Sequence, residues 1–130
     1  VNYKKAIEWF EKAAEQGVTW AQYNLGNMYK NGRGVDVNYK KAFEWYEKAA
    51  KQGYARAQYN LGALHELGHG MDQSISMAMR WYAKADAQGF EKAQAAIRKL
   101  VSKRRASAAA AEAPPAGFGN SQEDPGKERK

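Results

Sequence analysis

The sequence contains no cysteine and no long apolar run, and only 3 of its 130 residues are proline. Without cysteine the chain forms no disulfide, and it has neither thiolate zinc ligands nor a thiol nucleophile. Without about 20 consecutive apolar residues it has no segment that would cross a membrane as a helix. These absences exclude several classes of protein, but they do not identify the compartment.

Acidic residues are in deficit, and the formal net charge is +7. The basic excess is densest after residue 97, in a cluster consisting of Arg98, Lys99, Lys103, Arg104 and Arg105. Cations stabilise the C-terminal end of a helix, and we favour that interpretation. The alternative is contact with phosphates of a nucleic acid or with an anionic membrane surface. No aromatic residue is interleaved with the cluster, which counts against a single-stranded nucleic acid partner.

The dominant feature of the sequence is an internal repeat with a period of 36 residues. The segment 1–6 returns with the same residues as 37–42, and the segment 21–26 returns as 57–62. A third and more divergent copy runs from Ala78 to Gln94. Agreement of this length predicts an array of equivalent structural units.

Each period contains two helical patterns. In the first, Ala21, Leu25, Met28 and Tyr29 have the spacing of one apolar helical face. In the second, over residues 39–51, a wider apolar stripe lies opposite a charged face. Neither helix can bury its stripe alone, so the pattern predicts an all-α fold of stacked helix hairpins.

The ends of these helices have their own signals. Asp36 and Asp72 are the residue type that caps a helix N-terminus, and we expect them to cap the second helix of each unit. Gly17, Gly53 and Gly89 suit a left-handed stop at its C-terminus. Gly26 and Gly62 are expected to let neighbouring helices approach closely.

The repeated segments resemble the Sel-1-like repeat, a relative of the tetratricopeptide repeat. The resemblance covers roughly residues 1–101 and is carried by the segments 21–26, 32–35, 41–42 and 45–53. It implies a right-handed α-solenoid of antiparallel helix hairpins whose first helices line a concave surface. It also implies a scaffold or adaptor that binds a protein or peptide, without cofactor or catalytic residues. The family's cysteine-rich branch has been linked to β-lactam binding, and its paired cysteines are missing here.

We expect the array to occupy residues 1–105 and an Ala-rich extension with a disordered tail to occupy 106–130. Because the chain opens inside a repeat, we also expect it to be the C-terminal piece of a longer array. The expected units are the second helix of a truncated repeat at 1–17, repeats at 18–53 and 54–89, and a capping helix at 90–105. That last helix is assigned as a cap because Arg98 replaces the packing glycine.

The segment His65-Glu66-Leu67-Gly68-His69 matches the zinc-hydrolase signature H-E-x-x-H. A zinc-dependent hydrolase is therefore the enzymatic alternative. Two histidines converge on a metal in this motif only when both lie on one continuous helix. Gly68 is an inter-helix loop glycine of the repeat, so we expect the helix to end before His69. We therefore predict neither a metal site nor catalysis.

One row on the first helices is the candidate binding site. The row consists of Tyr23, Asn27 and Lys30, with Tyr59 and Glu66 from the next repeat. Tyrosine, amide and mixed charge suit a peptide-binding surface. The alternative is a merely solvated face.

The tryptophans divide into two groups. Trp9, Trp45 and Trp81 recur in register and are predicted to belong to the core. Trp20 has Arg56 and Lys92 as its repeat equivalents, so it is expected to be partly exposed. It is therefore a candidate contact point, unless it packs against the preceding repeat.

Overall fold

The computed structural model describes residues 2–112, and over that range the only regular elements are six α-helices. The helices are α1 (Tyr3–Glu15), α2 (Thr19–Asn31), α3 (Tyr39–Lys51), α4 (Ala55–Leu67), α5 (Ile75–Ala87) and α6 (Glu91–Glu112). The all-α fold predicted from the repeat is confirmed. The predicted disordered tail lies, from residue 113 on, outside the described residues.

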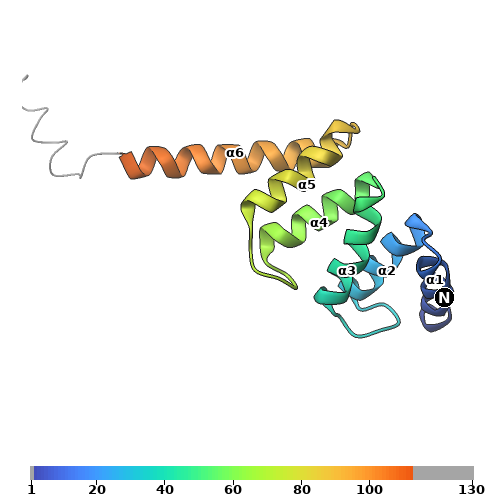
Figure 1. Cartoon of the computed structure of the whole chain (residues 1–130). Coiled ribbons are helices and arrows are strands. Elements are labelled where there is room, and N and C mark those ends of the chain that lie inside the picture. The colour runs from blue at the N-terminus through green and yellow to red at the C-terminus, as the bar shows by residue number, and fades with distance from the viewer. Residues whose placement is uncertain (1, 113–130) are drawn as a thin grey trace, which may run out of the picture. The chain divides into compact units, whose positions relative to one another are not determined.

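The helices stack in chain order. α1 packs against α2, α2 against α3, α3 against α4, and α4 against α5, and Figure 1 shows this succession from blue to yellow. The chain divides into two compact units, residues 1–97 and residues 98–130. α6 begins in the first unit and continues into the second.

The core of the first unit is built from alanine, leucine and tyrosine at repeat-equivalent positions. Ala21 and Leu25 of α2 are fully buried, as are Ala57 and Leu61 of α4. Tyr46 of α3 is also fully buried. Small residues allow the helices to approach closely, and the long apolar residues fill the remaining space.

The two helical glycines mark the closest approaches. A Cβ at Gly26 would lie 2.5 Å from the ring of Tyr46, and one at Gly62 would lie 2.7 Å from the ring of Tyr82. The expected close packing at both glycines is confirmed. The groups that require it are the tyrosine rings of the following helix and, at Gly62, also the carbonyl of Ala78 at 3.2 Å.

The caps at the helix N-termini differ from the prediction. The side chain of Asn38 accepts a hydrogen bond from the backbone N–H of Lys41 at 3.0 Å, and Ser74 plays the same part for α5. The prediction of Asp36 and Asp72 was wrong, because each lies two residues too early in the chain. The predicted left-handed stops are confirmed, with φ between 85° and 92° at Gly17, Gly53 and Gly89.

The tryptophans of the repeat are buried to different extents. Trp45 and Trp81 are partly buried and pack against the core, whereas Trp9 is 74% exposed. α3 and α5 each pack against the helix that precedes them, and α1 has no preceding helix within residues 2–112. The prediction that Trp9 belongs to the core was therefore wrong.

Candidate functional site

Two hollows lie on the first unit. The amide hollow has a volume of about 370 Å³, and the aromatic hollow has a volume of about 290 Å³. The amide hollow is lined by Tyr3, Ala6, Phe10, Asn24, Asn27, Met28, Asn31 and Arg33. The aromatic hollow is lined by Tyr23, Arg56, Tyr59, Asn60, Phe90 and Lys92.

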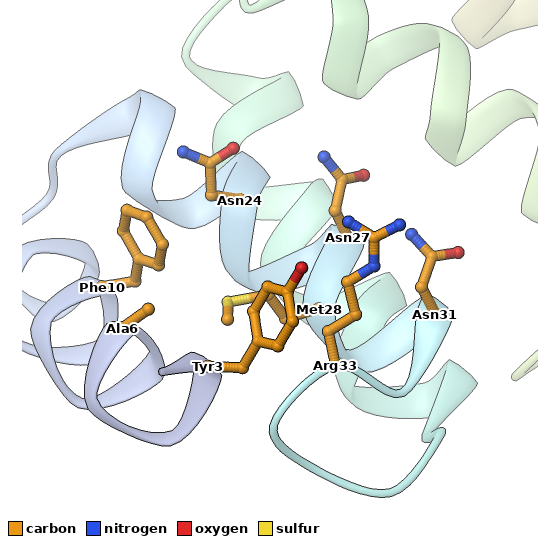
Figure 2. Close-up of a pocket in the computed structure, with 8 residues that line it drawn as sticks. All are labelled: Tyr3, Ala6, Phe10, Asn24, Asn27, Met28, Asn31 and Arg33. Carbon is orange, nitrogen blue, oxygen red and sulfur yellow. The ribbon is translucent and has the colours of Figure 1, made fainter. Parts of the chain in front are cut away.

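The amide hollow lies between α1 and α2. Figure 2 shows three carboxamides, those of Asn24, Asn27 and Asn31, across from aromatic side chains of α1. Within residues 2–112 the side chains of Asn24 and Asn31 make no hydrogen bond. A carboxamide both donates and accepts hydrogen bonds, as a peptide group does. The free carboxamides of Asn24 and Asn31 therefore present both donors and acceptors to the amide hollow.

A cation completes the amide hollow. The guanidinium of Arg33 lies 5.8 Å from the centre of the Tyr3 ring. This distance is within the range of a cation–π interaction. Arg33 is exposed and so remains open to a further, negatively charged partner.

The aromatic hollow is formed by α2, α4 and the start of α6. Tyr59 packs against Phe90 with ring centroids 5.4 Å apart, and Tyr23 packs against Tyr54 at 5.1 Å. The hydroxyls of Tyr23 and Tyr59 have no hydrogen-bond partner within the described chain. The rings are thus held in place while their hydroxyls stay unused.

The residues of the row predicted on the first helices do not form one surface in the structure. Tyr23 and Tyr59 line the aromatic hollow, and Asn27 lines the amide hollow. Lys30 and Glu66 are partly buried and line neither of the two.

Two residues of the row already have partners inside the protein. Asn27 Oδ1 accepts hydrogen bonds from the Tyr46 hydroxyl at 2.5 Å and from Asn60 Nδ2 at 3.3 Å. Glu66 accepts one from the Tyr82 hydroxyl at 2.7 Å. These bonds between helices give Asn27 and Glu66 a structural role.

Burial sets the protonation of these tyrosines. Burial raises the pKa of the Tyr46 hydroxyl, and it raises the pKa of the Tyr82 hydroxyl together with the nearby carboxylate of Glu66. Both hydroxyls therefore stay protonated and act as hydrogen-bond donors.

The H-E-x-x-H segment is divided between a helix and a loop. α4 ends at Leu67, and Gly68 then takes φ +74°. His65 packs edge-on against Phe43, whereas His69 stacks on Tyr39 with ring centroids 4.4 Å apart. The predicted helix end before His69 is confirmed. Within residues 2–112 no group of three or more His, Cys, Asp or Glu side chains is placed to hold a metal ion.

Trp20 and the residues of the basic cluster are not among the side chains that line the two hollows. Trp20 is 52% exposed and packs edge-on against Phe10, so it shows the partial exposure that the sequence predicts. The basic cluster is exposed along α6, within the unit 98–130. None of the helices in the described chain is long and apolar enough to cross a membrane.

Several lining residues are missing from the predicted row. These residues are Tyr3, Phe10, Asn24, Asn31, Arg33, Arg56, Asn60, Phe90 and Lys92. A signal for two of them was present in the repeat, since Arg56 and Lys92 occupy the position that the sequence marks as exposed through Trp20. The others come from α1, from the ends of helices and from residues beside the row, where periodicity alone does not show which side chains meet.

Comparison with known proteins agrees with this architecture. The family model described as the Sel1 repeat matches residues 1–18, 21–54 and 55–90. The chain belongs to the Sel1 repeat family. Sel1 repeat proteins are generally protein-interaction scaffolds and are typically non-catalytic.

Three solved structures are similar to these Sel1 repeats. A Sel1 repeat protein from Oxalobacter formigenes is 41% identical with a TM-score of 0.71, and the match covers 74% of this chain and 40% of that one. The protective antigen c5321 of uropathogenic Escherichia coli, described as having an SLR fold, is 31% identical with a TM-score of 0.70. This match covers 72% of this chain and 20% of that one. Cysteine-rich protein B of Helicobacter pylori is 27% identical with a TM-score of 0.69, and the match covers 73% of this chain and 71% of that one. The match thus spans less than half the length of the first two, and a comparison with curated proteins finds no match.

Proposed function

We propose that this chain is an interaction scaffold that binds a peptide segment of a partner protein along the two hollows. The observation that carries the proposal is the set of unused polar groups on a rigid support. Asn24 and Asn31 in one hollow, and the hydroxyls of Tyr23 and Tyr59 in the other, have no hydrogen-bond partner within residues 2–112. Helices hold all four groups, so a partner would meet a preorganised surface.

The surroundings of the histidines support a non-catalytic role. His65 is only 7% exposed, and aromatic rings flank both His65 and His69. A general base must reach the proton that it abstracts. We therefore propose no hydrolase activity for the H-E-x-x-H segment, and partner binding alone for the array.

The experiment uses the full chain as bait in native lysate, with and without nuclease. The test variant combines Tyr23→Phe, Asn24→Ala, Asn31→Ala and Tyr59→Phe, which removes polar groups while keeping the rings and the net charge. We expect recovery of the partner protein, measured by quantitative mass spectrometry, to fall at least about tenfold.

A matched control variant combines Tyr39→Phe, Ser76→Ala and Gln94→Ala, which lie outside both hollows. We expect it to recover the partner as the natural chain does. Equal recovery by the test variant and the natural chain would contradict the proposal. Loss of captured nucleic acid on nuclease treatment, with no protein recovered, would favour the basic cluster instead.

A further inference from the structure

The aromatic hollow carries two cations that have no internal partner. Arg56 and Lys92 are exposed, and no carboxylate is among the residues that line the hollow. Within residues 2–112 the one ion pair closer than 4.0 Å joins Lys51 to Glu47. Neither cation of the hollow therefore forms an ion pair within the described part of the chain.

The position of Arg56 in its helix is electrostatically unfavourable. Arg56 is the second residue of α4, and Lys92 is the second residue of α6. The N-terminal end of a helix carries partial positive charge and favours anions. The first turn of α4 contains no acidic residue, and its N-cap residue, Tyr54, makes no side-chain capping bond. The first turn of α6 differs, because it contains Glu91 next to Lys92. A bound anion would relieve the repulsion at Arg56 and would also lie near the backbone N–H groups of the first turn of α4.

The preceding repeat supplies an internal comparison. Counting back one period places Trp20 at the position of Arg56 and Arg56 at the position of Lys92. The equivalent surface one repeat earlier would thus hold one cation where the aromatic hollow holds two. The pair of cations is a local property of this hollow and not a general property of the repeat.

The aromatic rings limit what can occupy the hollow. Tyr59 packs against both Tyr82 and Phe90, and Tyr23 packs against both Tyr46 and Tyr54. Stacking of a nucleic acid base requires an open ring face. Rings with two aromatic neighbours are better suited to contacts with aliphatic groups. The volume of about 290 Å³ fits one or two side chains of a peptide.

We propose that the aromatic hollow selects an acidic peptide segment, with a Glu or Asp carboxylate between Arg56 and Lys92. An adjacent aliphatic side chain packs on Tyr59 and Phe90, and Asn60 lies beside them as a polar contact. The inference rests on the proposed function, because it names the chemistry of the peptide that the scaffold binds. Charge-assisted contacts of this kind give specificity for acidic over neutral segments.

The test measures binding of labelled peptides to the full chain by fluorescence anisotropy. The probes are a library of peptides of about ten residues, each containing Leu and Glu and each paired with a version in which Gln replaces Glu. We expect Glu peptides to bind at least about tenfold more tightly than their Gln versions. We also expect their affinity to fall between about 50 and about 500 mM NaCl.

The decisive variant combines Arg56→Gln with Lys92→Gln. It should abolish the preference for Glu, whereas the control pair Arg80→Gln and Lys84→Gln, with the same loss of charge outside the hollow, should keep it. An equal loss in both pairs would overturn the inference, because general charge would then explain the binding. Tighter binding of a single-stranded oligonucleotide through Arg56 and Lys92 would overturn it as well.

The outcomes separate this inference from the proposed function. If Glu and Gln peptides bind equally and the Tyr23, Asn24, Asn31 and Tyr59 variant weakens both, the scaffold proposal stands and the acidic preference is wrong. If no peptide of the library binds, the acidic preference is wrong, and the bait experiment still decides the scaffold proposal.

Discussion

At the scale of single residues, the packing inside the array depends on the size and polarity of the side chain at a few positions. Gly62 faces the ring of Tyr82, and His65 fills the place that Tyr29 fills one repeat earlier. His65 and Tyr29 are each 7% exposed. These positions allow folding to be tested separately from binding.

Gly62→Ala tests the close packing of α4 on α5. Replacing glycine by alanine within a helix ordinarily stabilises it by up to about 1 kcal/mol. Here the added Cβ would lie 2.7 Å from the Tyr82 ring, so we expect a loss of about 1–3 kcal/mol in the free energy of unfolding. Chemical denaturation measures this value.

The matched background is Tyr82→Leu, which removes the ring. In that background we expect Gly62→Ala to cost much less, and the difference gives the coupling between the two positions. A stabilising Gly62→Ala in the natural chain would show that the close approach is not real.

His65 makes stability depend on pH. Burial lowers the pKa of His65 below its ordinary value of 6.5, and the nearby Glu47 opposes this shift only in part. Because the folded-state pKa is the lower one, the unfolded chain takes up the proton first. The contribution of His65 is therefore complete above pH 6.5 and is lost as the pH falls from there towards the folded-state pKa.

The measurement is the melting temperature at about pH 7.5 and about pH 5. We expect His65→Tyr, which restores the residue found at position 29, to lose less stability on acidification than the natural chain. An unchanged pH dependence in His65→Tyr would assign the effect to other groups.

At the scale of the helices, the two classes begin differently. α1, α3 and α5 have side-chain caps from Asn2, Asn38 and Ser74, whereas α2 and α4 have none. The uncapped helices α2 and α4 both contribute to the candidate site, together with the capped helix α1 and the start of α6.

Asn38→Ala should cost about 1 kcal/mol of the free energy of unfolding, because the N–H of Lys41 loses its acceptor. Asp36→Ala, two residues earlier, makes no capping bond to lose and should leave stability almost unchanged. Asn38→Ser should retain most of the cap. A greater loss from Asp36→Ala than from Asn38→Ala would restore the capping role that the sequence suggests for Asp36.

The period predicts the helices well, because residues spaced along one face must be buried together. It also predicts the helix end between His65 and His69, since Gly68 is in register with Gly32. The period of the sequence does not predict which side chains of different helices contact one another. The bond from Tyr46 to Asn27 has no exact counterpart, because Ala63 follows one period after Asn27 and Tyr82 bonds Glu66 instead.

The two hollows could not be predicted from the sequence for a similar reason. They arise where side chains of separate helices meet, as Tyr3 of α1 meets residues of α2. A row drawn on one helix therefore includes Tyr23 and Asn27 but misses Asn31 and Arg33. The exposure of Trp9 likewise depends on contacts between helices, because no helix of the described residues packs on the side of α1 away from α2.

At the scale of the whole first unit, the contacts repeat with the sequence. Gln22 and Gln58 each donate to a backbone carbonyl of the preceding helix at 3.1 Å. Gln52 then donates to Gln22, and Gln88 donates to Gln58, at 2.8 and 3.0 Å. Buried polar groups that are satisfied in the same way in each repeat hold successive hairpins in one register. Such a support lets the surface residues vary without loss of the fold.

The central claim is that the hollows bind a partner while other residues maintain the fold. The direct measurement compares, in one experiment, partner recovery and melting temperature for the natural chain and for the variant with Tyr23→Phe, Asn24→Ala, Asn31→Ala and Tyr59→Phe. We expect a melting temperature within a few degrees of the natural value, about what a change of 1 kcal/mol produces, and recovery of the partner reduced at least about tenfold. Full recovery of the partner, or a loss of binding that only accompanies a loss of folding, would contradict it.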